Sequence, residues 1–272
     1  MENNVILKDL NKKWLNWFRG FNDAEGNFQI YPKKRVLKSG VISKFNVGYS
    51  YHLSLHKRDI DLLKHIQNKL QGKGVIYEYD SKSDSRLAVN DKLGLLYLIE
   101  NIFDLYPLVT NNQYIRYTLL KEGLINGIKE FKTLEQFHNY KSQRLLFITS
   151  QMESKNRIEK LFNNLEIDHW IVGFINGEGC FYLNKNKCNF FIEHTDKQAL
   201  EIIKQRLCFT PNVLQRSPRQ RDIGKIRKTT YQLVVSSKKD IQNLILFLEN
   251  KNNVPLQGYK YTQYVKWKQQ NK

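Results

Sequence analysis

The 272-residue sequence has few cysteines and lacks several common signatures, and each absence excludes a class of protein. Its three cysteines, Cys180, Cys188 and Cys208, form no CxxC pair, which argues against a zinc site and favours a reducing compartment. No apolar run reaches the roughly 18 residues of a membrane span, and residues 1–13 lack an apolar signal core. The GxxxxGK[ST], HExxH and GxSxG motifs are also missing, so the enzyme classes that depend on them are not expected.

Acidic residues are scarce beside basic ones. The chain has 44 Lys and Arg against 26 Asp and Glu, for a net charge of +18. An excess of this size is typical of proteins that bind a polyanion, although a generally basic soluble protein remains the alternative. The length predicts one or two domains with a sizeable core. The many Lys, Asn, Ile, Tyr and Phe residues, all served by AT-rich codons, suggest an organellar or AT-rich genome.

One stretch occurs twice without a gap. Residues 17–28 read WFRGFNDAEGNF and residues 170–181 read WIVGFINGEGCF, so both fit W-x-x-G-F-x-[DN]-[AG]-E-G-x-F. The two glutamates, Glu25 and Glu178, are 153 positions apart. A repeat at this spacing predicts two similar half-domains related by a pseudo-two-fold axis.

Each copy begins as a helix with a small residue four positions after a glycine. Gly20 is followed by Ala24, and Gly173 by Gly177. Residues four apart share a helix face, so these pairs allow two helix backbones to approach closely, as small-xxx-small pairs do in membranes.

Each copy then changes from helix to strand. Gly26 and Gly179 stand where a helix C-terminus favours a residue with positive φ, and alternating residues follow. If the helices pair side by side, Glu25 and Glu178 lie together at two helix C-termini, where negative charge is unfavourable without a cation. Oxygen ligands of this kind suit Mg²⁺, and metal-assisted phosphodiester chemistry follows from that arrangement.

This duplicated stretch resembles the signature of the LAGLIDADG homing endonucleases, in their single-chain form with two motifs. The resemblance extends from about Lys12 to Lys268. It implies an α+β fold of two pseudo-symmetric αββαββα half-domains, whose antiparallel sheets form a saddle over DNA. It also implies a monomer that acts as a site-specific double-strand DNA endonuclease at a long, asymmetric target.

The order of predicted elements repeats in the two halves. In the first half, strands follow the signature helix at about 27–31 and 46–56, and residues 32–44 form a basic turn or extended hairpin between them. A helix at 57–70, strands at 75–79 and 85–89, and helices at 91–103 and 112–125 follow. We predict an N-terminal half-domain at 1–130, a charged, partly helical connector at 131–166, and a C-terminal half-domain at 167–272.

The outward faces of the predicted sheets are rich in amides, hydroxyls and cations, which suit base edges in the major groove of double-stranded DNA. The predicted contacts in the first half are Asn27, Gln29, Tyr31, Lys33, Arg35, Lys44, Ser50, His52, Ser54 and Arg86. Those in the second half are Tyr182, Asn184, Asn186, Asn189, Glu193 and Gln232. A basic loop of Arg216, Arg219, Arg221, Lys225, Arg227 and Lys228 is expected to contact phosphates rather than bases. For any one of these residues, an ordinary solvated strand face is the alternative.

By resemblance, Glu25 and Glu178 bind divalent metal ions beside the scissile phosphates, and the carbonyls of Ala24 and Gly177 complete the ligand set. The cofactor implied is Mg²⁺, with Mn²⁺ or Ca²⁺ able to replace it for binding. The family often has a lysine after the Pro-Leu break that leads into the last helix of each half. Lys260 matches it in the second half, whereas Asn112 stands near that position in the first, so basic assistance is expected to be one-sided.

Three further predictions concern the surroundings of the acids. Lys228 is a second, weaker candidate for basic assistance. Where the family often has a glutamine at the end of the second strand, beside the solvent pocket, this chain has His56 in one half and His194-Thr195 in the other. The resemblance therefore leaves the water-organising role open, and an ordinary strand-end role is the alternative for each histidine. Asp23 is interpreted as a helix-end group rather than a metal ligand.

Two other functions fit the same sequence. One is an intron maturase that binds host intron RNA, and the other is a DNA-binding protein that no longer cleaves. Retention of both glutamates favours cleavage. Composition and family habit together place the protein in a mitochondrion or another organelle.

Overall fold

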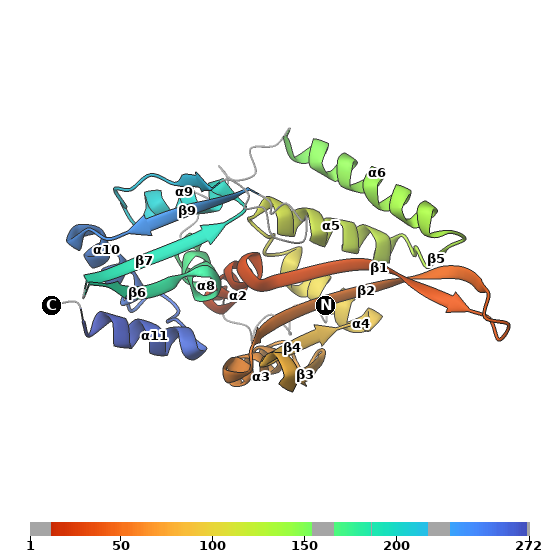
Figure 1. Ribbon diagram of the computed structural model, residues 1–272, viewed down its shortest axis with the longest axis horizontal. Coiled ribbons are helices and arrows are strands. Elements are labelled where there is room, and N and C mark those ends of the chain that lie inside the picture. The colour runs from red at the N-terminus through yellow and green to blue at the C-terminus, as the bar shows by residue number, and fades with distance from the viewer. Residues whose placement is uncertain (1–11, 154–165, 186, 217–228, 271–272) are drawn as a thin grey trace. The chain divides into compact units, whose positions relative to one another are not determined.

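The computed structural model describes residues 12–153, 166–185, 187–216 and 229–270 (Figure 1). The first repeat comprises α2 (Lys12–Glu25), β1 (Gly26–Val36), β2 (Ile42–His56), α3 (Ile60–Lys69), β3 (Val75–Tyr79), β4 (Asp84–Val89), α4 (Lys92–Leu98) and α5 (Asn111–Ile125). β5 (Glu130–Phe131) and α6 (Leu134–Glu153) follow it. The second repeat comprises α8 (Ile167–Glu178), β6 (Cys180–Asn184), β7 (Lys187–His194), α9 (Lys197–Arg206), β8 (Leu214–Arg216), β9 (Thr230–Val235), α10 (Lys238–Leu248) and α11 (Gly258–Lys268).

Each repeat builds one antiparallel sheet. The strand order is β1-β2-β4-β3 in the first and β6-β7-β9-β8 in the second, and β5 pairs with β2 outside this order. The predicted αββαββα order is confirmed, and one more helix closes each repeat. Residues 32–44 form the outer part of a long β1–β2 hairpin, in which Pro32 pairs with Val47.

Packing divides the chain into two units whose boundaries differ from those of the repeat. The first contains Gly26–Asn164, and the second contains Leu10–Glu25 together with Leu165–Lys272. The first signature helix, α2, therefore belongs to the same unit as the second signature helix, α8. Within this unit, α2 and α8 lie side by side (Figure 1).

Two glycines explain how closely α2 and α8 approach. A Cβ atom on Gly20 would lie 2.0 Å from the Trp170 carbonyl oxygen, and one on Gly173 would lie 1.9 Å from the Trp17 carbonyl oxygen. Any larger side chain would collide with backbone atoms at these positions. The predicted close pairing through small residues is confirmed.

The prediction that Gly26 and Gly179 adopt positive φ is wrong. Gly179 has φ −67° and ψ 139°, and Gly26 begins β1, paired with Leu53. Each helix thus passes directly into extended backbone without a left-handed residue. At Gly179, the reason for glycine is steric, because a Cβ there would lie 2.6 Å from the Ile175 carbonyl oxygen.

The first unit has an aromatic core beneath its sheet. Phe28 contacts Tyr51, Phe103 and Tyr117, with ring centroids 5.1–5.5 Å apart. Phe28 is buried, as alternation along β1 predicted. Aromatic rings at these separations contribute beyond their buried area, so the cluster anchors β1 and β2 against the following helices.

The predicted connector contains a long helix that packs onto the first unit. Phe137 and Ile148 of α6 join Ile30 and Leu119 in one buried cluster. Arg144 of α6 forms an ion pair with Glu122 of α5 at 2.6 Å. The segment therefore adds a layer to the first unit within its described part.

The core of the second unit holds the last helix against its sheet. Phe181 of β6 packs against Tyr264 and Trp267 of α11, and the Trp267 indole N–H donates to the Tyr182 carbonyl at 3.2 Å. This packing fixes the position of Lys260, one turn earlier on α11. Among the described helices, none has both the length and the apolar character needed to cross a membrane.

Candidate active site

The two signature glutamates come together at the ends of the paired helices. Glu25 is the last residue of α2 and Glu178 is the last residue of α8. A Cβ on Gly177 would lie 2.5 Å from the Ala24 Cβ and 3.0 Å from the Glu25 Cγ. The close approach of the helices thus continues to their C-terminal ends and places two half-buried carboxylates beside each other.

Ionisation of Glu178 is unfavourable in the protein without a bound cation. Burial, and then the charge of Glu25, raises the pKa of Glu178 to about 8, and Glu193 adds to this rise. Lys260 acts in the opposite direction. Burial and like charge therefore both disfavour the ionised form of Glu178, and a cation bound beside it would favour that form.

The donor set fits a hard divalent cation held with few protein ligands. The groups near the helix ends are carboxylate and carbonyl oxygens, which Mg²⁺ and Ca²⁺ prefer over nitrogen or sulfur. In the described part of the chain, no three His, Cys, Asp or Glu side chains group as a metal site. An ion here would therefore keep open positions for water and substrate oxygens, as Mg²⁺ often does.

Lys260 lies beside the second glutamate. Its ammonium group donates to the carbonyl of Gly179 and to that of Gly177 at 3.4 Å. These two carbonyls flank Glu178, so the cation is held next to the carboxylate. The position fits the predicted basic role, whereas Lys228, the other candidate, lies outside the described residues.

The counterpart of Lys260 in the first repeat is Gln113, not Asn112 as predicted. Gln113 is the third residue of α5, as Lys260 is of α11, and its Nε2 donates to the Gly26 carbonyl at 2.5 Å. Sequence alignment missed this because the loop after Pro107 is one residue longer than the loop after Pro255. An alignment that allowed one gap there would have found the pair.

The two strand-end histidines each accept a hydrogen bond from the next turn. Nδ1 of His56 accepts from the Arg58 amide at 3.1 Å, and Nδ1 of His194 accepts from the Asp196 amide at 3.0 Å. His194 also packs edge-on against Phe174, and burial lowers its pKa. These contacts favour the ordinary strand-end role over a role in organising water.

Asp23 is fully buried within the helix pair. Its Oδ2 accepts from the Trp170 indole N–H at 2.7 Å. The carboxylate thus bonds across from α2 to α8 inside their interface. This agrees with its interpretation as a helix-end group rather than a metal ligand.

The outward face of the first sheet is largely accessible. Asn27, Gln29, Tyr31, Lys33 and Arg35 alternate along β1, opposite His52, Ser50, Gly48, Asn46 and Lys44 of β2. The Tyr31 ring lies over Gly48, with Lys33 5.2 Å from the ring centroid, and Lys44 pairs with Glu130. The expectation that Ser50 faces solvent is wrong, since it is only 5% exposed.

Arg86 shapes the polar character of this face. Arg86 Nε donates to the Ser54 hydroxyl at 2.9 Å, across the β2–β4 pairing. Burial, followed by the charge of Arg86, lowers the pKa of His52 to about 4. His52 is therefore neutral at physiological pH and presents a hydrogen-bonding ring rather than a cation.

The outward face of the second sheet carries a charged network. Glu193 of β7 accepts from Arg216 of β8 at 3.0 Å and from the Thr230 hydroxyl of β9 at 2.7 Å. Sequence reasoning listed Glu193 and Arg216 separately and missed both the pair and Thr230. Gln232 pairs directly with Glu193 across the β7–β9 ladder and is half-buried.

Three predicted contacts at the β6–β7 pairing differ in exposure. Tyr182 and Asn184 are exposed on β6, but Asn189 is only 5% exposed and donates to the Lys187 carbonyl, so its expected exposure is wrong. The predicted contacts outside the described residues are Asn186, Arg219, Arg221, Lys225, Arg227 and Lys228.

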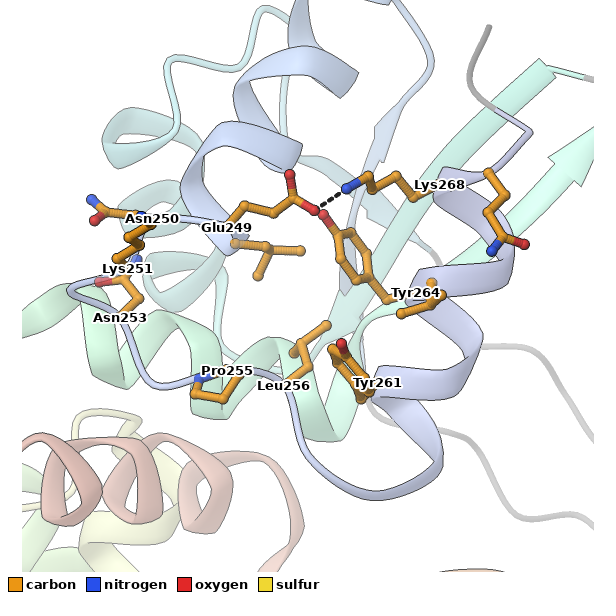
Figure 2. Close-up of a pocket in the computed structure, with 12 residues that line it drawn as sticks. Glu249, Asn250, Lys251, Asn253, Pro255, Leu256, Tyr261, Tyr264 and Lys268 are labelled. Atoms are coloured by element: carbon orange, nitrogen blue, oxygen red, sulfur yellow. Dashed lines mark hydrogen bonds and ion pairs between the residues drawn. The ribbon is translucent and has the colours of Figure 1, made fainter.

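A cavity of about 650 Å³ lies elsewhere in the second unit, between the end of α10 and α11 (Figure 2). Leu248, Leu256 and Tyr264 line it, and Glu249 and Lys268 form an ion pair at its side. No predicted catalytic residue lines this cavity. The paired helix ends, not the cavity, thus hold the groups capable of chemistry.

Comparison with known proteins agrees with this geometry. A family model described as LAGLIDADG endonuclease matches residues 18–123 and 171–271, which covers both repeats. The probable intron-encoded endonuclease aI3 of Kluyveromyces lactis is 25% identical over an alignment of 294 positions, which covers 93% of this chain and 64% of that protein. The chain thus spans just under two thirds of the length of that curated relative.

Solved structures show the same fold. The I-LtrWI LAGLIDADG homing endonuclease bound to target DNA matches with a TM-score of 0.65 and 24% identity, covering 96% of this chain and 90% of that one. I-SmaMI bound to uncleaved DNA in the presence of calcium ions matches with a TM-score of 0.63 and 22% identity, at the same coverage.

Proposed function

This chain belongs to the LAGLIDADG endonuclease family, and from that premise we propose that it cuts both strands of a long, asymmetric DNA site with the help of a divalent metal ion. The observation that carries the proposal is the pairing of Glu25 and Glu178 at abutting helix ends, where burial and like charge raise the pKa of Glu178. A purely structural helix pair would have no need to hold two carboxylates in this way.

The chain's own residues would divide the chemistry between them. Glu25 and Glu178 would hold the metal ion, together with the backbone carbonyls of Ala24 and Gly177. A divalent ion held there supplies Lewis-acid stabilisation for the negative charge that develops on a phosphodiester during hydrolysis. Lys260 would favour the ionised form of Glu178 and place a positive charge beside the departing oxygen.

The outward sheet faces would bind the DNA. Amide and guanidinium groups such as Gln29 and Arg86 suit base edges, and the basic residues of the β1–β2 hairpin suit phosphates. The net charge of +18 supports this assignment and predicts steeply salt-dependent affinity. A flat salt response would count against DNA contact through these faces.

Glutamine substitutions test the proposal. Purified protein would be incubated with Mg²⁺ and a DNA library in which cleaved sequences are recovered, with Ca²⁺ and EDTA as the non-cleaving conditions. We expect Glu25→Gln and Glu178→Gln each to lower double-strand cleavage by about 10³-fold or more while affinity in Ca²⁺ is retained, since the isosteric amide removes only the charge. Full cleavage by either variant would overturn the assignment.

The same assay separates the two other functions. An RNA-binding maturase would bind host intron RNA and assist its splicing without cutting DNA, whereas a non-cleaving DNA-binding protein would select a site and leave it intact. We also propose a monomer, because one chain carries both glutamates, and light scattering would check it. An organellar location rests on the codon-like composition and on the intron-encoded relative, and imaging of the tagged protein would test it.

Mg²⁺ is the ion we propose for the reaction, with Mn²⁺ as a substitute and Ca²⁺ as an ion that supports binding. The oxygen-only donor set supports this choice, and so does the related protein whose structure was obtained in the presence of calcium ions. Cleavage with Mg²⁺ and binding without cleavage in Ca²⁺ are the expected results.

A further inference from the structure

Gln113 and Lys260 occupy the same place in the two repeats. Each is the third residue of the helix that closes its repeat, and each donates a hydrogen bond to the carbonyl of the glycine after a signature glutamate. For Gln113 that glycine is Gly26, and for Lys260 it is Gly179. The backbone interaction is thus maintained in both halves while the donor differs.

The difference is one of charge. Lys260 brings an ammonium group that also reaches the Gly177 carbonyl, whereas Gln113 offers a neutral amide and is only 7% exposed. Either donor can form a hydrogen bond to a backbone carbonyl. They cannot act equally on a phosphate that gains negative charge, because a hydrogen bond from a charged donor is roughly twice as strong as one from a neutral donor.

We propose that the two strands are cut in order, with the phosphodiester beside Glu178 hydrolysed first because its half alone has a lysine at this position. This inference rests on the proposed nuclease function and deepens it. At each strand, a water oxygen bonds to phosphorus as the bond from phosphorus to the 3′ oxygen breaks. The water gives up a proton to solvent and the 3′ oxygen takes one, leaving a 5′ phosphate and a 3′ hydroxyl.

The ratio of the two strand cleavage rates, which we call the bias, follows from the difference between a charged and a neutral donor. Exchanging one for the other changes a buried interaction by about 1–1.5 kcal/mol, which corresponds to about a tenfold difference in rate. A duplex nicked in one strand should therefore accumulate before full cleavage.

A strand-resolved assay tests the inference. The target recovered by the library selection would carry a different fluorophore at each 5′ end, and the initial cleavage rate of each strand would be measured in Mg²⁺. We expect about a tenfold bias in the wild type. Lys260→Gln should remove it by slowing the faster strand, and Lys260→Arg should preserve most of it. Gln113→Lys should reduce it by speeding the slower strand.

Controls separate the possible failures. Lys268→Gln changes another lysine of α11, one that pairs with Glu249 away from the acids, and should leave the bias unchanged. No cleavage of either strand by the wild type would defeat the proposed function itself. Equal wild-type rates, or a bias that Lys260→Gln leaves intact, would overturn the inference while the nuclease function stands. Lys260→Gln decides the matter even if Gln113→Lys does not fold.

A binding measurement provides a readout independent of turnover. In Ca²⁺, Lys260→Gln should lower the slope of log affinity against log salt by about 0.9, the value for one lost phosphate contact on duplex DNA. Lys268→Gln, whose partner is Glu249, should lower the slope less. An unchanged slope for Lys260→Gln would show that the ammonium group does not face a phosphate, and the inference would fail.

Discussion

The two signature helices present nearly the same surface to each other, yet their polar contacts are unequal. The Trp170 indole N–H of α8 donates to Asp23 of α2, whereas the buried indole N–H of Trp17 has no hydrogen-bond partner among the described residues. The residue equivalent to Asp23 is Asn176, and its side-chain oxygen accepts from the Gln257 amide at 2.6 Å. The difference teaches that the glycine contacts fix the geometry, while polar side chains at the same positions are free to diverge.

Replacing Gly20 or Gly173, the glycines at the contact between α2 and α8, should have the largest effect, because it disrupts the packing of the two helices. Gly20→Ala and Gly173→Ala each place a methyl group within about 2 Å of a backbone carbonyl oxygen of the facing helix. We expect each to lower the free energy of unfolding by more than about 4 kcal/mol, because backbone atoms must shift. Chemical denaturation would measure the loss.

Gly40→Ala is the control for the glycine substitutions. Gly40 has φ +82° with nothing near its missing Cβ, so alanine there suffers backbone strain but no collision. Its cost should be about 1 kcal/mol. Losses of equal size at Gly20 and Gly40 would contradict the close-approach explanation.

Removing the buried carboxylate should have the next largest effect. Asp23→Ala leaves the Trp170 indole N–H without its acceptor and should cost about 2–3 kcal/mol, whereas Asp23→Asn keeps an acceptor and should cost less. Thermal unfolding of both variants would provide the comparison. If Asp23→Asn were as destabilising as Asp23→Ala, the carboxylate charge, not the hydrogen bond, would be the important feature.

The acid pair predicts a pH dependence of stability in the absence of metal. The folded pKa of Glu178 is raised to about 8, so the folded protein binds a proton that the unfolded chain releases above pH 4.5. Stability contributed by this group should therefore fall as pH rises from about 4.5 to 8. Relative to the wild type, Glu178→Gln should gain about 1–2 kcal/mol between pH 5 and pH 8 in EDTA.

Urea denaturation at the two pH values would measure this gain. Added Mg²⁺ at pH 8 should stabilise the wild type more than Glu178→Gln, because the ion binds the ionised pair in the folded state. A wild type and variant whose stabilities differ by the same amount at both pH values would show that burial does not hold Glu178 protonated.

The smallest effect should come from the tryptophans themselves. Trp170→Phe removes the donor to Asp23, while Trp17→Phe removes an N–H that has no described partner. Both lose similar packing, so Trp170→Phe should be the more destabilising by about 1 kcal/mol. Denaturation curves of the two single variants would measure this difference, and equal losses would mean that the hydrogen bond contributes little.

Most of the fold could be predicted from the duplicated stretch at residues 17–28 and 170–181 and from the order of elements that follows each copy. Apolar alternation placed Phe28 and Ile30 in the core, and the small residues of the signature predicted the helix contact. The outward face was predicted less well, because strand alternation assigns a side but not an exposure. Ser50 and Asn189 are predicted on the outward side, yet each is only 5% exposed.

The candidate site was predicted where the two copies align and missed where they do not. Glu25 and Glu178 follow from the gapless repeat. Gln113 did not, because a one-residue difference in loop length shifted the alignment. The φ of Gly179 could not be predicted from the sequence either. A glycine at a helix end is required either where the backbone is left-handed or where a Cβ would collide with another atom. At Gly179 the second reason applies, because a Cβ would collide with the Ile175 carbonyl oxygen.

The placement of α2 in the second packing unit affects synthesis of the chain. The ribosome makes α2 before any of the residues it packs against, and α8 follows roughly 150 positions later. Until α8 emerges, the apolar face of α2, including Trp17 and Phe21, is without its native cover. The nascent chain therefore depends on its later half to bury α2.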